Sequence, residues 1–435
     1  MDEALSHGSP YQAYVYGYPH KTAYRPLAPA RRLAEVWADE PKSALSLYVH
    51  VPFCEMRCGF CNLFTSPRPR EDRVERYLAT LARQIERVGA ALGPVRFARF
   101  AIGGGTPTWL SPHQLHALFD RVATLGADPR HCPTSVEVSP ETATHERLAV
   151  LRARGVDRVS IGVQSFVESE SAAVARPQAT TAVEGALDAI RGLGFPTLNV
   201  DLMYGLPGQS PATWERSLRA ALRSSPEELY LYPTYVRPLT GLGRRGESWD
   251  DLRVSLYRQG RALLLAEGYT QLSMRMFRAP HAPVGQGPAY CVQDDGMVGL
   301  GAGARSYTRA LHYGTDYAVS APAVREAIEA WTSRESDEFD WVDHGIALDV
   351  DEQRRRWVAL GLLGDGLDRA AYAQRFGIDV LAELPWLERL FELGLATVDA
   401  HRVALTELGV ERSDAVGPFL FSAAVRARMA SWEPR

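Results

Sequence analysis

The sequence predicts an α/β protein built around a partial, open (β/α)6 barrel. Short apolar or β-branched runs alternate with segments of helical periodicity from about residue 44 to residue 235. Six such units imply parallel strands joined by right-handed crossovers, and they are too few for a complete eight-fold barrel. Most helical segments also begin near Ser, Thr, Pro or Asp and end near Gly, as capped helices do.

The expected strands are short runs bounded by turn residues. They cover Ala44–Val51, Phe97–Ile102, Thr134–Val138, Asp157–Val163, Thr197–Met203 and Leu229–Tyr235. The segments between them show the apolar spacing of helices that bury one face. They cover Glu75–Leu92, Ser111–Leu125, Glu141–Ala153, Ala179–Leu193 and Thr213–Leu222. In such barrels chemistry collects at the carboxyl ends of the strands, so the residues that follow each strand are the candidate site.

The chain has 435 residues, more than one hydrophobic core usually supports, so we expect further units. Residues 1–43 are rich in Tyr and Pro without clean periodicity, which predicts an irregular N-terminal extension lying over the barrel. The barrel is expected over residues 44–270, and a connecting region with a Gly-rich pocket loop over residues 271–345. Residues 346–435 are expected to form a C-terminal winged-helix-like α+β module, with helices over Asp351–Leu363, Asp368–Phe376 and Val380–Leu393 and a hairpin over Leu395–Thr406.

Composition and charge narrow the functional classes. Apolar residues make up 46% of the chain and charged residues 23%, as in an ordinary soluble enzyme. The formal net charge of −4 gives no basic footprint, so we expect no nucleic-acid partner. No apolar stretch reaches the roughly 20 residues that a membrane-spanning helix needs, and the first residues lack the layout of a signal peptide. We therefore expect a cytoplasmic protein without a membrane span.

Three of the five cysteines lie on one short loop after the first strand, at Cys54, Cys58 and Cys61. An odd number of cysteines with three clustered argues against a disulfide framework and for a metal or redox site. Three thiolates can hold three irons of a [4Fe–4S] cluster and leave the fourth iron open. The alternatives are unrelated buried thiols and a structural zinc site, which normally takes four closed ligands; the only other metal-type side chain of the loop is Glu55.

Further candidate residues follow the next strands. Glycines at 103–105, before Thr106, allow a backbone to approach a ligand closely. Glu137, Gln164 and Asp201 stand at the ends of three later strands. A lone acidic residue there is often a helix cap, but three in register on one barrel indicate a pocket rim.

Together these motifs resemble the oxygen-independent coproporphyrinogen III oxidase family of radical S-adenosylmethionine (SAM) proteins, also called HemN-like. The resemblance covers roughly residues 45–425, and its motifs are specific in combination. The matching segments are residues 48–54, 58–62, 103–108, 137–140, 162–166, 201–209, 299–304, 375–379 and 405–409.

The resemblance implies a radical SAM barrel with Cys54, Cys58 and Cys61 as catalytic and metal-binding residues. One electron entering the [4Fe–4S] cluster would cleave S-adenosyl-L-methionine reductively and form a 5′-deoxyadenosyl radical, which takes a hydrogen atom from the substrate. The implied partners are a small-molecule substrate, acidic or tetrapyrrole-like, and an electron donor such as flavodoxin or ferredoxin.

The family's cofactor contacts carry over by motif. The cluster-bound SAM would meet Tyr48, Gly104 and Glu137. A second SAM, bound in the oxidase members, would meet Phe60, Gly105, Thr106, Gln164, Arg176 and Asp201. Arg305 and Pro233 fall near further contact positions. Of the remaining cysteines, Cys132 is expected to be a buried apolar residue, and Cys291 is a candidate hydrogen-atom donor.

The chain departs from the family pattern at two informative places. The oxidases carry a fourth cysteine two positions after the third, where this chain has Leu63. The haem chaperones carry a His-Asn…Tyr-Trp motif that residues 289–295 lack. We expect an oxidoreductase of the coproporphyrinogen III oxidase type, with a two-SAM (class C type) radical methyltransferase as the alternative and a haem chaperone as the third possibility.

Overall fold

The computed structural model describes residues 2–246, 251–284 and 292–435, and the chain divides into two compact units. The larger unit contains residues 25–270, 278–345 and 433–435, and the smaller contains residues 1–24, 271–277 and 346–432. Cys291 lies outside the described residues. The four-part division made from the sequence remains a prediction, and each unit is described by itself below.

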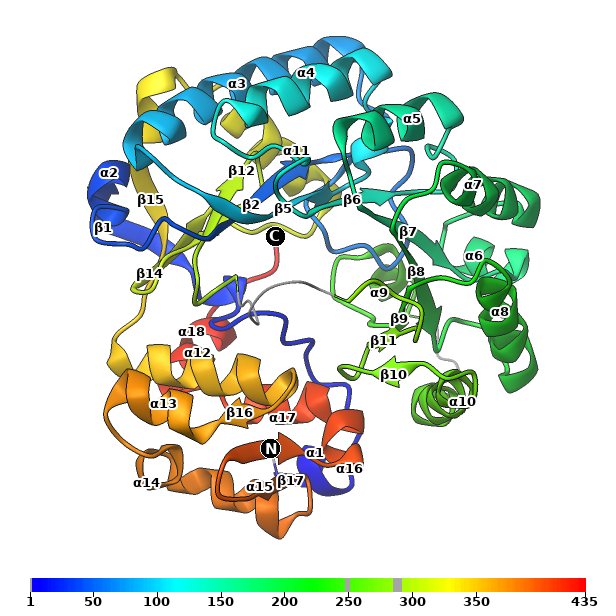
Figure 1. The fold of residues 1–435 in the computed structure, drawn as a ribbon, viewed down its shortest axis with the longest axis vertical. Coiled ribbons are helices and arrows are strands. Elements are labelled where there is room, and N and C mark those ends of the chain that lie inside the picture. Colours follow the sequence, from blue (N-terminus) through cyan, green and yellow to red (C-terminus); the bar gives the residue numbers. More distant parts are fainter. Residues whose placement is uncertain (1, 247–250, 285–291) are drawn as a thin grey trace. The chain divides into compact units, whose positions relative to one another are not determined.

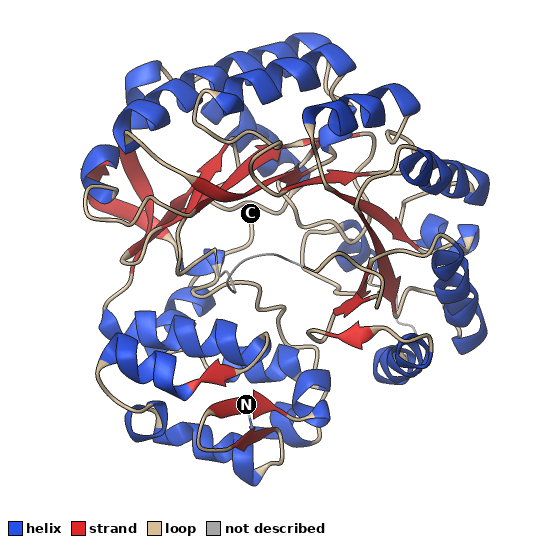
Figure 2. Cartoon of the chain, viewed as in Figure 1, coloured by secondary structure: helices blue, strands red, loops and turns tan. Residues whose placement is uncertain are grey.

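The larger unit is built on a curved sheet with helices along its outer face (Figures 1 and 2). Its central strands run parallel in the order β2-β5-β6-β7-β8-β9. They cover Leu45–Val51, Phe97–Gly104, Thr134–Val138, Arg158–Gln164, Thr197–Tyr204 and Glu228–Pro233. The covering helices α3, α4, α5, α7, α8 and α10 span Glu71–Leu92, Pro112–Ala123, His145–Arg154, Thr180–Gly192, Pro211–Arg223 and Arg253–Ala266. The open (β/α)6 barrel predicted from the sequence is confirmed.

Local chemistry explains where these helices begin and end. Ser111 and Ser210 each form a capping box with the third helical residue, at the starts of α4 and α8. Helix α5 ends at Gly155, which has the left-handed conformation that glycine adopts at little cost. The apolar faces of the helices are buried; in α3 the buried residues Val74, Tyr77, Leu81, Ile85 and Val88 follow helical spacing.

The sheet continues beyond β2 in a way that the sequence did not indicate. Strand β12 (Met297–Leu300) pairs in parallel with β2, and β13, β14, β15 and β1 extend the sheet beyond it. They cover Arg305–Tyr307, Leu311–Gly314, Trp341–Ala347 and Arg25–Arg32. Strands of three or four residues are too short to show an alternating pattern. Strand β1 contains Pro26 and Pro29, and it tolerates them because it lies at the edge of the sheet.

Residues 25–36, which the sequence does not mark as regular, thus form β1 and the short helix α2 (Leu33–Val36). The remaining elements of the larger unit are short or outside the parallel barrel. They are β3 (Phe53–Cys54), β4 (Ser66–Pro67), η2 (Pro107–Trp109), α6 (Glu168–Ala173), α9 (Gly241–Arg245), α11 (Ala321–Thr332) and η3 (Ser336–Asp340). Two further short strands, β10 (Thr270–Gln271) and β11 (Met276–Arg278), each contain residues of both units.

The smaller unit contains the helices and hairpin expected at the C-terminus. A three-stranded sheet has the order β16-β18-β17, with strands Leu367–Asp368, Arg402–Leu405 and Ala396–Val398. Its helical elements are α1 (Asp2–Ser6), η1 (Lys21–Ala23), α12 (Val350–Leu363), α13 (Arg369–Phe376), α14 (Val380–Glu383), η4 (Pro385–Leu387), α15 (Glu388–Glu392), α16 (Glu407–Glu411), α17 (Ser413–Phe419) and α18 (Ala423–Ala430).

Two features of this unit differ from the expectation. The single helix expected over Val380–Leu393 is broken into α14, η4 and α15, because Pro385 cannot donate the hydrogen bond that would continue the helix. The N-terminal arm is also part of this unit, since Leu5, Tyr18, Ala23 and Tyr24 lie in its hydrophobic core.

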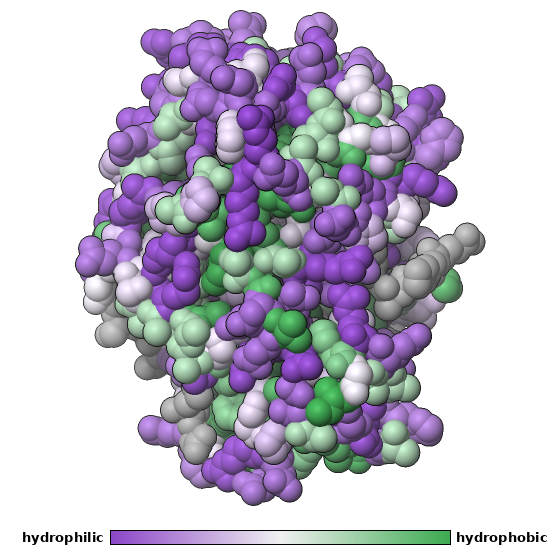
Figure 3. Space-filling view, turned by 90° about the vertical axis from the view of Figure 1, so that its left-hand side faces the viewer, coloured by the Kyte–Doolittle hydropathy of each residue, from purple (hydrophilic) through white to green (hydrophobic). Residues whose placement is uncertain are grey.

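Polar side chains dominate the face of the molecule that Figure 3 draws. The face drawn in Figure 3 is largely hydrophilic, with hydrophobic residues scattered among the polar ones. Among the described residues, no helix combines the length and the apolar character that crossing a membrane requires.

Candidate functional site at the carboxyl ends of the barrel strands

The three clustered cysteines lie on a loop that neighbouring loops hold in place. Cys54 ends β3, which pairs with β4, and the backbone N–H of Cys61 donates to the carbonyl of Cys58 at 3.0 Å. The N–H of Gly59 donates to the carbonyl of Val174 at 2.7 Å. The carbonyl of Gly59 accepts from the N–H of Leu242 at 2.8 Å. The loop is thus fixed from two sides before any ligand binds.

The thiols of this loop lie close to one another; Cys58 is buried, and Cys54 and Cys61 are half-buried. The pKa of Cys54 is raised to about 12, mainly by burial and in addition by the neighbouring Cys61 and Cys58. Burial is also the main cause of the raised pKa of Cys61, which the Arg57 charge opposes. Three thiolates so placed need positive charge to remain deprotonated, and a metal supplies it by displacing the protons. This donor set fits an iron–sulfur cluster.

Polar side chains contact each of the three sulfur atoms. Arg176 Nη1 donates to Cys58 Sγ at 3.3 Å. Thr106 Oγ1 donates to Cys54 Sγ at 3.7 Å, and Cys61 Sγ lies 3.8 Å from Thr65 Oγ1. The described residues form no group of three His, Cys, Asp or Glu side chains that could hold a single metal ion. A cubane has a different requirement, because each of its irons takes one thiolate.

The glycine loop that follows β5 packs against the cysteine loop without room for side chains. Gly104 has φ +104°, and a Cβ atom there would lie 2.3 Å from the His50 ring. A Cβ atom on Gly105 would lie 2.5 Å from the carbonyl oxygen of Phe53, the residue before Cys54. Glycine is therefore required at both positions.

Two carboxyl groups at the strand ends have raised pKa values. Burial raises the pKa of Glu137 to about 7; the N–H of Gly104, which donates to Glu137 Oε2 at 3.0 Å, opposes this and nearby Asp201 adds to it. Burial likewise raises the pKa of Asp201 to about 6. The side chain of Glu137 is nevertheless open to solvent. Glu137 is therefore surrounded by protein but still reached by solvent, as a side chain that lines a concave site is.

Asp201 is held by residues that the sequence did not single out. Asn199 Nδ2 donates to Asp201 Oδ1 at 2.7 Å and to Ser160 Oγ at 2.7 Å. Below them, Arg158 forms an ion pair with Glu228 at 2.8 Å and donates to Ser135 Oγ. The sequence could have indicated this layer, because polar residues such as Arg158 and Ser160 alternate along β7, β8 and β9. Alternate residues lie on the same face of a strand.

Gln164 and Arg176 occupy a strained part of the backbone after β7. Gln164 has φ +69° and Ala175, which precedes Arg176, has φ +53°. Such conformations are uncommon for residues other than glycine and cluster at functional sites. Arg176 Nη2 donates to the carbonyl of Gly162 at 2.6 Å, so the chain bends back to place this guanidinium beside Cys58.

Tyr48 is held by His50, a residue that the sequence analysis did not include in the site. His50 Nε2 lies 2.9 Å from the carbonyl oxygen of Phe64, which can only accept, so the proton is on Nε2. His50 Nδ1 then accepts from the Tyr48 hydroxyl at 3.2 Å. Burial raises the pKa of Tyr48, so the hydroxyl remains protonated as this hydrogen bond requires.

The described candidate site residues named from the sequence lie in the larger unit. Most of them are on β2, on the later strands up to β8 or on the loops that follow these strands. Phe60 packs, together with Tyr232, against a buried cluster of Val174, Met203, Leu206 and Leu242. Arg305 and Pro233 lie on β13 and β9. Cys132 is buried, as predicted.

Comparisons with known proteins match two family models and several relatives. The family model described as the radical SAM superfamily matches residues 48–221, and the HemN C-terminal domain matches residues 348–411. An oxygen-independent coproporphyrinogen III oxidase from Pseudomonas aeruginosa is 30% identical over 388 residues, which cover 84% of this chain and 83% of the relative. The heme chaperone HemW from Bacillus subtilis is 28% identical over 374 residues, covering 84% and 96%.

A solved structure shares the fold over nearly the whole chain. Coproporphyrinogen III oxidase (HemN) from Escherichia coli aligns with a TM-score of 0.75 at 22% identity, over 97% of this chain and 98% of that one.

Proposed function

Because the chain belongs to the HemN-like family of radical SAM proteins, we propose that it is a coproporphyrinogen III oxidase-like oxidoreductase. The observation that carries the proposal is the loop of three thiols beside Gly104 and the Glu137 carboxyl. When bound, the reduced [4Fe–4S] cluster and SAM supply a 5′-deoxyadenosyl radical that abstracts a hydrogen atom from the substrate. The residues below hold and orient these groups.

In this proposal Cys54, Cys58 and Cys61 bind the cluster and leave one iron for SAM. The backbone at Gly104 and Gly105 approaches the ligand closely, since neither residue has a side chain in the way. Glu137 and Tyr48 both have raised pKa values. Their side chains form hydrogen bonds with the amino and hydroxyl groups of the first SAM.

The proposed contacts of a second SAM are Phe60, Gly105, Thr106, Gln164, Arg176 and Asp201. Asp201 is oriented by Asn199, and Arg176 by Gly162, so both side chains are positioned in advance. Pre-organised groups lower the cost of binding. The number of SAM molecules bound is part of the proposal.

One observation favours a second candidate, a two-SAM radical methyltransferase. The oxidases carry a fourth cysteine at the position where this chain has Leu63. Leu63 is 47% exposed. An exposed leucine offers neither a metal ligand nor a hydrogen-atom donor. If the oxidase reaction depends on that cysteine, this chain would transfer a carbon from the second SAM instead.

The deciding experiment is an anaerobic assay. The protein is reconstituted with iron and sulfide, reduced with dithionite, and mixed with SAM and coproporphyrinogen III, and the products are followed by mass spectrometry. Stepwise loss of two carboxyl groups supports the oxidase. S-adenosylhomocysteine together with 5′-deoxyadenosine supports the methyltransferase. Failure to form 5′-deoxyadenosine by a fully loaded protein, together with tight stoichiometric haemin binding, would contradict both and favour a haem carrier.

A further inference from the structure

Arg57 lies inside the cysteine loop, between Cys54 and Cys58, and is a residue to which neither the motifs nor the comparisons give a role. Its side chain is half-buried, and Nη2 donates to the carbonyl oxygen of Val319. Val319 is itself buried, and its N–H donates to the carbonyl of Arg435 at 2.7 Å. It immediately precedes Ser320, the N-cap of α11. The guanidinium is therefore anchored to a rigid part of the barrel unit rather than free to turn into solvent.

The other terminal nitrogen of this guanidinium has no acceptor. Nη1 of Arg57 is buried and has no hydrogen-bond partner among the described residues. Buried polar groups normally have a partner, and a buried charge is normally paired. The groups of this loop that can carry negative charge are Glu55 and the three cysteines. The Arg57 charge acts on one of these cysteines, since it opposes the rise in the pKa of Cys61.

We propose that Arg57 sets the reduction potential of the [4Fe–4S] cluster by holding a fixed positive charge beside its cysteine ligands. The inference rests on the proposed function, because it requires the cluster. The sign follows from charge: reduction by one electron adds a negative charge to the cluster, and a nearby guanidinium stabilises that state more than the oxidised one. Arg57 thus raises the midpoint potential and makes the cluster easier to reduce. The Arg176 hydrogen bond to Cys58 Sγ acts in the same direction.

Arginine is suited to this role. Its guanidinium stays charged at any pH the protein meets, and its fork allows one nitrogen to be anchored while the other remains available to a ligand. Removal of a positive charge a few ångströms from a partly buried group changes its energy substantially. An exposed arginine of the same region has a much smaller effect because solvent screens it.

The test is an anaerobic redox titration of the reconstituted protein, with the reduced cluster measured by electron paramagnetic resonance. Arg57→Met should lower the reduced-to-oxidised ratio at a fixed potential about tenfold, equivalent to a shift of about 59 mV to more negative potential. Arg57→Lys keeps the charge and should stay close to the wild-type value. The matched control is Arg70→Met, since the Arg70 side chain is 79% exposed and paired with Asp72.

Iron and sulfide content is measured on each variant before the titration. A fully loaded Arg57→Met protein with the wild-type midpoint would overturn the inference, as would an equal shift in Arg57→Lys. If Arg57→Met does not load, Arg57→Gln, which keeps a donor for the Val319 carbonyl, is titrated with the same expectation. Failure of the wild-type protein itself to form a cluster would contradict the proposed function, and is distinguished by the iron content alone.

Discussion

The pKa values of carboxyl groups at the rim of the barrel and in the C-terminal module are shifted in opposite directions. At the rim, burial raises the pKa values of Glu137 and Asp201, because the partners within the chain do not compensate the lost hydration. In the module, Asp399 has a lowered pKa because it accepts hydrogen bonds from the N–H groups of His401 and Arg402. Burial of Asp379 is outweighed by the Leu381 N–H and by Arg369, so its pKa is also lowered.

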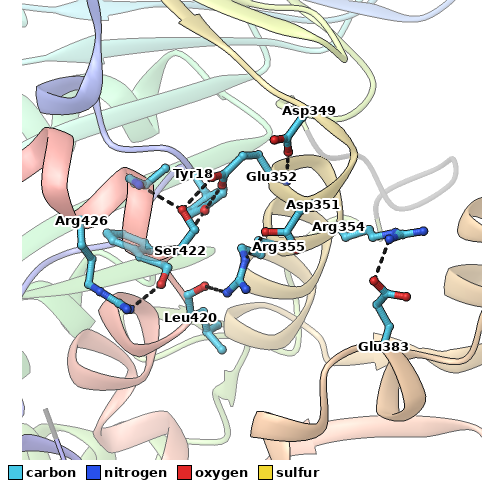
Figure 4. A network of polar contacts seen from close by, with 12 residues as sticks. Tyr18, Asp349, Asp351, Glu352, Arg354, Arg355, Glu383, Leu420, Ser422 and Arg426 are labelled. Atoms are coloured by element: carbon cyan, nitrogen blue, oxygen red, sulfur yellow. Dashed lines mark hydrogen bonds and ion pairs between the residues drawn. The ribbon is translucent and has the colours of Figure 1, made fainter.

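The polar network in Figure 4 likewise pairs polar and charged groups of the module with partners inside the module. Tyr18 donates to Glu352, whose other carboxyl oxygen accepts from Ser422 Oγ at 2.7 Å. Close by, Arg354 donates to Glu383 at 2.7 Å. These partners come from the N-terminal arm, α12, α14 and the start of α18, so the network joins distant segments. Charged groups of the module are thus paired inside the module, whereas burial of the rim carboxyls Glu137 and Asp201 is not compensated by partners in the chain.

The largest expected effect is at the cysteine loop. Cys58→Ala should abolish cluster assembly, because two remaining thiolates cannot hold three irons. The measurement is iron and sulfide content after anaerobic reconstitution. Cys132→Ala is the matched control, since Cys132 is buried away from the loop, and it should load fully. Full loading of Cys58→Ala would show that the rim does not depend on this ligand.

A smaller but still severe effect is expected in the glycine loop. Gly104→Ala places a Cβ atom against the His50 ring at a positive φ, so it should destabilise the protein by about 2–6 kcal/mol through strain and overpacking. Chemical denaturation measures the change. Gly185→Ala, in α7 with nothing within 4 Å of the added Cβ, should instead stabilise by about 0.5–1 kcal/mol. Equal effects at the two positions would contradict the close packing of the rim.

In the module, Tyr18→Phe removes one hydroxyl from a buried network. We expect a loss of about 1–3 kcal/mol, because Glu352 and the Ser422 N–H each lose a partner. Cluster content should stay at the wild-type level, which separates stability of the module from loading of the rim. Tyr16→Phe is the control on the same N-terminal arm, since Tyr16 is 37% exposed whereas Tyr18 is buried. An iron-poor Tyr18→Phe protein of normal stability would break the comparison.

The smallest expected effect is a pH dependence of stability. Because the pKa of Glu137 is raised from 4.5 to about 7, the folded state favours its protonated form. The group therefore stabilises the fold at low pH, and this contribution is lost as the pH rises towards and through 7. Solvent access to the side chain reduces the size of the effect. Glu137→Gln should show a smaller fall in melting temperature between pH 5 and pH 8 than the wild-type protein, both prepared without iron.

Asp399→Asn is the control for this comparison. Its lowered pKa puts the titration of Asp399 below 3.8, so this variant should follow the wild-type melting curve between pH 5 and pH 8. Glu137→Gln and wild-type protein with the same pH dependence would contradict the raised pKa of Glu137.

The sequence by itself determined the features that depend on local spacing. Alternation and helical periodicity placed the six central strands and their helices close to where they lie, and the cysteine spacing placed three thiols on one loop. The break in the helix at Pro385 could also have been predicted from the sequence. The apolar pattern continues through Pro385, but proline has no N–H to continue the helical hydrogen bonds. The strand-end positions of Glu137, Gln164 and Asp201 also followed from the parallel pattern.

Local patterns do not indicate which distant groups come into contact; this depends on how the chain folds. The strands β12 to β14 are too short to identify alone, and they exist because β2 offers an edge to pair with. The N-terminal arm joins the core of the module through Tyr18 and Tyr24, which no local pattern indicates. In the site, the proton position on His50 depends on Phe64, and the anchor of Arg57 depends on Val319. These partners are separated in sequence by 14 and 262 residues, so folding alone brings them together.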